Sequence, residues 1–312
     1  MKQPKILVTG ATGKTGRAVV DELLAKGVPV RAVVRSKDAP SAALERAGAE
    51  TVVADMFDPD QLLAAMRGTQ RAYYLPIYDP YLIQSATAFA VAARNARLEA
   101  VVSLGKWLAS ATHPSLSTRQ AWLMDQVFSM MPGVAHVRVN PGYFADNYLR
   151  LIGYAAHLGV FPIVTGNSED APPSNEDIAR VVVAALMAPG KHAGKRYRPT
   201  GPALLSGDDM AHILSRVLGT KIRRVDLPWW MFRKAARLQN AGAFLMSGCG
   251  ITSKITSKVH LLLARPRMMF WKSRAVPPRI LRQPRGAMPP GQKPRGILET
   301  GCVPLLGSCA LP

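Results

Sequence analysis

The chain has 312 residues, three cysteines and a formal net charge of +20. A charge of this size points to nucleic acid or an anionic membrane, but half of it lies in residues 249–312, which hold eleven lysines and arginines and one acid, Glu299. Without that segment we expect no nucleic-acid partner. Residues 1–248 contain no cysteine, signal peptide, membrane-length apolar run or cluster of metal ligands. We therefore expect a cytoplasmic protein with one sizeable core, no membrane partner and no metal site.

The first predicted element is a buried strand over residues 5–8, which breaks into a turn and then a helical pattern. Glycines recur there at every third position. Such a triplet permits a tight turn, lets the backbone approach a pyrophosphate and lets the helix pack close to the strand. The helix N-terminus adds N–H donors and partial positive charge. We predict a dinucleotide-phosphate cradle made of Gly10, Thr12, Gly13, Lys14, Thr15 and Gly16.

A P-loop is excluded by spacing, because that motif needs a glycine where this chain has Val8. The second predicted strand covers residues 28–34, and dinucleotide folds recognise the adenosine ribose at its end. NAD-specific sites place an acid there, whereas this chain has Arg35, followed by Ser36 and Lys37. A guanidinium suits a 2′-phosphate, so we predict NADP(H) in preference to NAD(H). The alternative is that Arg35 is ordinary solvated surface.

Strands and helices continue to alternate to about residue 140. A third strand ends at Asp55, whose carboxylate either accepts from the adenine amino group or caps a helix that begins near Pro59. Further strands are predicted over 71–75, 99–103 and 134–139, and helices over 81–95 and 117–130. This alternation predicts an α/β fold with a doubly wound parallel sheet of the Rossmann type and helices on both faces.

Ligands bind such sheets outside the carboxyl ends of the strands. Residues that follow the strands are therefore candidates for contacts with the cofactor, and we predict such contacts from Pro76, Ser103, Pro141, Tyr143 and Phe144. No catalytic residue is assigned; the candidates are Ser103, Lys106 and Tyr143. The alternatives are hydrogen bonding inside the sheet for Ser103, solvation for Lys106 and packing for Phe144.

Five segments together resemble the NmrA-like branch of the atypical short-chain dehydrogenases. They are the glycine triplet and residues 33–35, 54–59, 140–147 and 174–179. The resemblance covers about residues 4–248. It implies an NAD(P)-binding Rossmann domain followed by a small C-terminal α+β lid. The branch includes reductases and redox-sensing regulators that bind the dinucleotide without turning it over.

The chain departs from the wider superfamily in its acid–base pair. Most short-chain dehydrogenases use a tyrosine and a lysine four residues later, which lowers the tyrosine pKa so that the phenol can pass a proton. None of the eight tyrosines here has a lysine at that position. Alcohol, ketone and sugar-epimerising chemistry are therefore not expected. Two possibilities remain. The protein transfers hydride to an acceptor that itself stabilises the charge, such as a quinone or a dye, or it catalyses no reaction.

Three regions are predicted. Residues 1–145 form the Rossmann domain, and residues 146–248 form the small substrate lid, with short strands over 196–198 and 222–225. Residues 249–312 are basic and rich in proline and arginine. Read one frame earlier, with synonymous codons chosen to favour it, residues 249–282 give an acidic sequence that resembles the usual end of the family. We interpret this tail as frame-shifted and expect it not to fold.

The leading hypothesis is an NADPH-dependent oxidoreductase that passes hydride to a small conjugated acceptor. The alternative is a non-catalytic NAD(P)-sensing regulator of the NmrA type, whose partner is another protein. Both hypotheses use the same dinucleotide site, so the sequence does not separate them.

Overall fold

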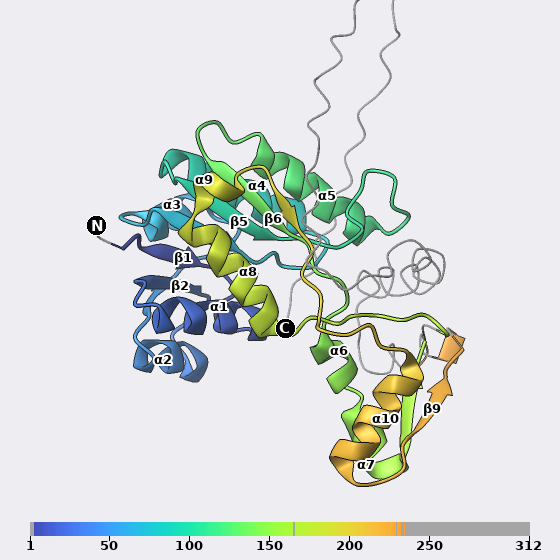
Figure 1. The fold of residues 1–312 in the computed structure, drawn as a ribbon. Helices are drawn as coiled ribbons and strands as arrows, with labels where there is room; N and C mark the ends of the chain where they lie inside the picture. The colour runs from blue at the N-terminus through green and yellow to red at the C-terminus, as the bar shows by residue number, and fades with distance from the viewer. Residues whose placement is uncertain (1–2, 165, 229, 232–233, 235–312) are drawn as a thin grey trace, which may run out of the picture. The chain divides into compact units, whose positions relative to one another are not determined.

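The computed structural model describes residues 3–164, 166–228, 230–231 and 234, all within one compact unit of the chain. Figure 1 shows strands and helices alternating along it. The strands of the main sheet are β1 (Ile6–Val8), β2 (Val30–Val34), β3 (Glu50–Val53), β4 (Arg71–Tyr74), β5 (Ala100–Leu104), β6 (Ala135–Val139) and β8 (Arg196–Tyr197). The helices around it are α1 (Lys14–Ala25), α2 (Ala39–Arg46), α3 (Pro59–Met66), α4 (Leu82–Asn95), α5 (Leu116–Ser129), α8 (Asn175–Met187) and α9 (Pro189–His192).

The seven strands are parallel and lie in the order β3-β2-β1-β4-β5-β6-β8. The chain winds outward from β1 to β3 and then returns to the other side of β1 with β4. Sheets of this class bind ligands at the carboxyl ends of the strands where the winding reverses. The glycine turn after β1 therefore lies at the switch point of the sheet.

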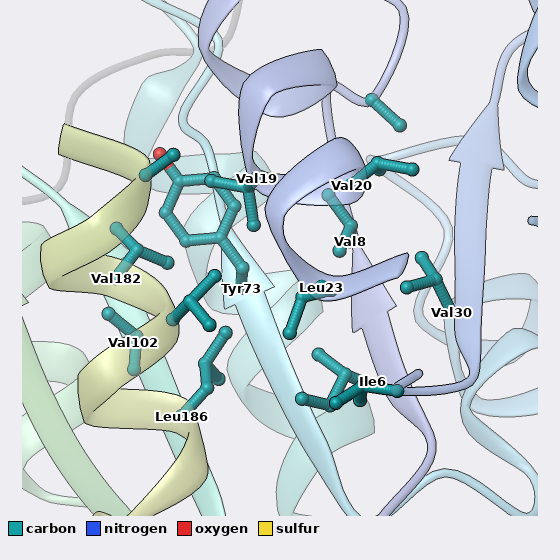
Figure 2. Packing of buried hydrophobic residues seen from close by; sticks show 14 of the residues in the cluster. Ile6, Val8, Val19, Val20, Leu23, Val30, Tyr73, Val102, Val182 and Leu186 are labelled. Atoms are coloured by element: carbon teal, nitrogen blue, oxygen red, sulfur yellow. The ribbon is translucent and has the colours of Figure 1, made fainter. Parts of the chain in front are cut away.

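One face of the sheet is covered by α1 and α8, which pack against each other. Figure 2 shows Val19 and Leu23 of α1 and Val182 and Leu186 of α8 converging on the buried ring of Tyr73. Strands β1 and β5 are buried along their whole length, because both faces of a parallel sheet are covered. This layer packs α1 against the sheet beside β1 and β2.

The opposite face is covered by α3, α4 and α5. Its centre is an aromatic cluster in which the rings of Phe89 and Phe128 lie 4.8 and 5.0 Å from that of Tyr74. Edge-to-face and tilted contacts of this kind add to the burial of large apolar surfaces. The Tyr74 hydroxyl is hydrogen-bonded to Ser85 at 3.0 Å, so the phenol adds no unsatisfied polar group to this core.

A smaller α+β region has a core of its own. It contains α6 (Ala145–Leu149), α7 (Ile152–Leu158), β7 (Val160–Ile163), α10 (Gly207–Leu218) and β9 (Arg223–Asp226), and β7 and β9 form a parallel pair. Helix α10 begins at a capping box, in which the Ser206 hydroxyl accepts from the Asp209 N–H at 3.1 Å, and it ends at Gly219 with a φ of +66°. Phe161, Ile163 and Met210 fill the space between helices and strands.

The predicted fold class is confirmed, and most predicted elements are present with ends shifted by one or two residues. Two elements differ. The strand predicted over 196–198 as part of the lid is β8, the edge strand of the main sheet, because its backbone pairs with β6. Strand β7 was not predicted. The domain boundaries at 145 and 248 remain predictions, and the tail that we interpret as frame-shifted, residues 249–312, lies outside the described residues.

Candidate functional site

The turn between β1 and α1 is shaped by Gly10 and Gly13. Gly10 has a φ of +61°, in the left-handed region that favours glycine. The Gly13 N–H donates to the Gly10 carbonyl at 3.0 Å and closes the turn, and Gly13 is the N-cap of α1. The first N–H groups of a helix have no intrahelical acceptor. An anion placed at this turn would accept from them.

The three glycines differ in what a side chain would meet. A Cβ on Gly16 would lie 2.1 Å from the Gly10 carbonyl oxygen, so glycine is required for α1 to pack against the turn. A Cβ on Gly10 would lie 2.5 Å from the Leu75 side chain. A Cβ on Gly13 would meet only the Gly10 oxygen, at 3.3 Å. The space at the second glycine is therefore left open by the protein, which fits a bound pyrophosphate.

Lys14 and Thr15 contact two residues that the sequence did not identify as part of the site. The Thr15 hydroxyl donates to Asn175 Oδ1 at 2.6 Å, and Asn175 Nδ2 donates to the carboxylate of Asp146. The same carboxylate forms an ion pair with Lys14. We call these four residues the loop network. It joins the glycine turn, in which Thr12 is exposed, to the starts of α6 and α8.

The residues predicted to recognise the ribose follow β2 in an exposed segment. Arg35 is exposed directly after the strand. Lys37 forms an ion pair with Glu45, and the hydrogen bond from Lys37 lowers the pKa of that carboxyl. Ser36 donates to the carboxylate of Asp38 at 3.2 Å. A 2′-phosphate at this point would compete with carboxylates for Lys37 and Ser36.

The helix that begins at Pro59 is capped by Asp58, whose Oδ1 accepts from the N–H groups of Asp60 and Gln61 at 2.9 and 3.0 Å. The alternative in which Asp55 caps this helix is therefore wrong. Asp55 is exposed after β3, and its Oδ1 accepts from the Phe57 N–H at 2.9 Å. Its contact with adenine remains a prediction.

Ser103 lies inside the sheet. Its hydroxyl is fully buried and hydrogen-bonded to His136 Nε2 at 2.8 Å, and the other ring nitrogen contacts the Ser129 hydroxyl at 3.1 Å. Burial, followed by the charge of Arg138, lowers the pKa of His136 to about 3. The imidazole is therefore neutral at physiological pH, with one nitrogen donating and the other accepting. The predicted contact of Ser103 with a cofactor remains untested.

Lys106 follows β5 in a loop, and its ammonium group donates to the Ser117 hydroxyl at 2.8 Å. It also lies 4.9 Å from the ring centroid of Tyr78. The Tyr78 hydroxyl donates to the Gly105 carbonyl at 3.1 Å, and burial raises the pKa of this phenol. The side-chain amide of Asn140 donates to the Lys106 carbonyl at 2.9 Å. The loop after β5 is thus held by the ends of both neighbouring strands.

The turn after β6 presents Tyr143 at the surface, where the side chain is 46% exposed. Its ring makes an edge-to-face contact with that of Tyr148 at 5.1 Å. The Tyr148 hydroxyl donates to the carboxylate of Asp170 at 3.1 Å, and burial and then the charge of Asp170 raise the pKa of the phenol. Tyr143 is accordingly the most exposed of the three catalytic candidates.

The three apolar candidates for cofactor contacts are buried or partly buried. Pro76 and Pro141, which follow β4 and β6, are buried. Phe144 packs against the core layer beneath α1 and α8, as its packing alternative predicts. Cofactor contacts from these residues stay predictions.

Residues 10–129 match a family described as NAD(P)H-binding. An NADPH-dependent quinone oxidoreductase of Escherichia coli, crystallised with NADPH, superposes with a TM-score of 0.72 at 23% identity, over 83% of this chain and 91% of its own. This structural likeness establishes the shared fold.

Two relatives extend the match over most of the chain. NAD(P)H azoreductase of Xenophilus azovorans is 27% identical over 272 residues, covering 83% of this chain and 86% of the azoreductase. The (4-alkanoyl-5-oxo-2,5-dihydrofuran-3-yl)methyl phosphate reductase of Streptomyces griseus is 30% identical over 276 residues, covering 85% of this chain and 95% of that reductase. The chain belongs to the NmrA-like branch of the atypical short-chain dehydrogenases.

This NmrA-like protein is therefore an NAD(P)H-binding Rossmann protein. None of the helices in residues 3–164 and 166–228 combines the length and the hydropathy that a membrane span requires.

Proposed function

We propose that this protein is an NADPH-dependent oxidoreductase that reduces a small conjugated acceptor. The observation that carries the proposal is the glycine turn, where Gly16 is required by the protein and Gly13 leaves open the space that a pyrophosphate would fill. Three similar proteins are named for the reduction of azo compounds, quinones and an unsaturated furanone phosphate. These acceptors share a conjugated system that spreads charge.

The choice of cofactor rests on Arg35. The guanidinium stands exposed at the end of β2, where NAD-specific folds place an acid. A planar, permanently charged group can donate two hydrogen bonds to a 2′-phosphate. NADP(H) is accordingly the proposed cofactor, with NAD(H) bound more weakly.

The choice of acceptor rests on the polar groups near the carboxyl end of β5. Ser103 is hydrogen-bonded to the neutral imidazole of His136, and Lys106 donates a hydrogen bond to Ser117. Neither is arranged as a tyrosine–lysine pair, which a ketone would need for protonation. NADPH, when bound, supplies a hydride with its two electrons. The protein positions the acceptor, and solvent supplies the proton that completes a hydroquinone or a reduced dye.

A second candidate function is a dinucleotide sensor. The loop network favours it, because the residues beside the expected phosphate, Lys14 and Thr15, are joined through Asp146 and Asn175 to α6 and α8. A phosphate that competes for Lys14 would release Asp146 and alter the start of α6. In this case the protein binds NADP(H) tightly, and a partner protein recognises the altered start of α6.

The two functions are separated by one experiment. Purified protein is titrated with NADPH, NADP⁺, NADH and NAD⁺, and NADPH absorbance is then followed with a panel of quinones and dyes. Gly13→Val serves as the control that removes the cofactor site. Turnover by the wild type and none by the control support the reductase. Tight NADPH binding with no turnover supports the sensor, and no binding of any dinucleotide contradicts both.

A further inference from the structure

The carboxyl ends of β5, β6 and β8 bring together an arginine and a tryptophan that the proposed function has not used. These three strands lie side by side at one edge of the parallel sheet. Trp107 follows β5, and Arg198 follows β8, with its guanidinium carbon 5.2 Å from the Trp107 ring centroid. The stacked arrangement holds the guanidinium plane in place and keeps its edge available for hydrogen bonds.

Two further arginines lie on the same face of the sheet. Arg138 of β6 pairs in register with Arg196 of β8, so these two side chains project from one face of the sheet, and Arg198 follows β8 two residues further along. The carboxylate of Asp125 is fully buried and lies 3.6 Å from Arg196. Burial raises the pKa of this carboxyl to about 6, and the charges of Arg196 and then Arg138 oppose the shift, so one acid lies near two of the three guanidinium groups.

These charges are poorly neutralised. Among the described residues, the Nε atoms of Arg138, Arg196 and Arg198 are buried without a hydrogen-bond partner. Burial lowers the pKa of Arg198, and the charge of Arg196 lowers it further. A cluster of cations with unpaired N–H groups is costly unless an anion binds beside it.

The position of the cluster relates it to the proposed reaction. The ribose-recognising residue Arg35 follows β2, on one side of the switch point, so the other half of a dinucleotide extends over the ends of β4 and β5. Trp107 lies directly beyond, at the end of β5. A Cβ on Gly142 would lie 3.7 Å from the Trp107 ring, which places this ring beside the turn that carries the exposed Tyr143. Aromatic surface and positive charge therefore adjoin at the place where an acceptor would meet the nicotinamide.

We propose that Arg198 and Trp107 form an acceptor subsite that binds a carboxylate or sulfonate attached to an aromatic or quinonoid ring. Arg198 donates hydrogen bonds to the anionic group, Trp107 and Tyr143 contact the ring, and Arg138 and Arg196 add positive potential. The inference rests on the proposed function, because it names the class of acceptor that the same site would prefer.

The test compares two acceptors of one ring system, naphthoquinone and naphthoquinone sulfonate, with NADPH as donor. Intrinsic reactivity differs between them, so the measured quantity is the change in kcat/KM for each acceptor caused by a substitution. Arg198→Gln should lower kcat/KM for the sulfonate about tenfold to a hundredfold, the range for loss of a charge-assisted hydrogen bond. The value for naphthoquinone should change by less than about threefold. Arg216→Gln, an exposed change of the same charge on α10, is the matched control and should leave the ratio unaltered.

Equal losses for both acceptors, or no loss for either, would overturn the subsite. A direct binding measurement keeps this result separate from failure of the proposed function. Naphthalene sulfonate is titrated by calorimetry into wild type and Arg198→Gln, each saturated with NADP⁺. Binding by the wild type that weakens at least tenfold in the variant supports the subsite even if no acceptor is reduced. Binding that is absent from the wild type, or equal in the two proteins, contradicts it.

Discussion

Replacing Gly16 and Gly13 by alanine should have opposite consequences for folding and for cofactor binding. Gly16 lies within α1, where alanine gains about 1 kcal/mol over glycine in helix propensity. The new Cβ would lie 2.1 Å from the Gly10 carbonyl oxygen and 2.6 Å from its carbon. These obstacles are backbone atoms, so the turn must move, at a cost at or above the usual 1–3 kcal/mol of overpacking. We expect Gly16→Ala to lower the free energy of unfolding by about 2 kcal/mol.

Gly13→Ala should leave the fold nearly intact. Gly13 has a φ of −83°, which alanine adopts without strain, and its Cβ would meet one oxygen at 3.3 Å. The loss of a favourable N-cap residue costs about 0.5–1 kcal/mol. The methyl group would project into the space left for a pyrophosphate, so NADPH affinity should fall at least tenfold, or about 1.4 kcal/mol.

Urea unfolding followed by circular dichroism, and NADPH titration followed by nicotinamide fluorescence, test both variants. A Gly16→Ala variant as stable as the wild type would show that the turn tolerates a side chain at this position. A Gly13→Ala variant that binds NADPH with unchanged affinity would show that the open space does not hold the phosphates.

Three further substitutions test the ribose end, the loop network and the buried histidine. Arg35→Ala should weaken NADPH at least tenfold in a fluorescence titration and leave NADH nearly unchanged; equal loss for both would make Arg35 ordinary surface. Asp146→Asn removes the carboxylate that pairs with Lys14, so both NADPH and NADH should bind severalfold more tightly at low salt; weaker binding would mean that Asp146 holds Lys14 in place for the phosphate. His136 has a pKa of about 3 in the folded protein and about 6.5 in the unfolded chain. Its contribution to the free energy of unfolding is therefore present above pH 6.5 and is lost as the pH falls. Between pH 6.5 and 5 the wild type should lose about 2 kcal/mol relative to His136→Gln in urea unfolding, and parallel pH profiles would contradict the buried neutral state.

The parts of the fold that were predicted from sequence are those set by local patterns. The glycine spacing, the buried strand before it and the helical pattern after it are all local, and the structure places a tight turn there. Alternating strands and helices likewise predict a parallel sheet. Strand β7 was missed because it is four residues long and its partner β9 lies about sixty residues later in the chain.

The contacts that complete the site depend on tertiary packing. Thr15 and Asn175 are separated by 160 positions and meet because α8 packs against α1. Trp107 and Arg198 meet because β8 adds to the edge of the main sheet, where the sequence had placed this strand in the lid. The hydrogen bond between Ser103 and His136 forms because the pairing of β5 with β6 brings the two side chains together. None of these pairings has a signal in a single sequence.

The proposed reaction is the oxidation of bound NADPH by direct hydride transfer to a conjugated acceptor. The most direct measurement is a single turnover with NADPH that carries deuterium on one face of the nicotinamide, using an azo or quinone acceptor in excess. We expect NADPH to be consumed with a primary isotope effect for one of the two deuterated forms, because a fixed cofactor presents one face to the acceptor. NADPH that binds tightly and is not consumed by any acceptor would contradict hydride transfer and leave the dinucleotide sensor.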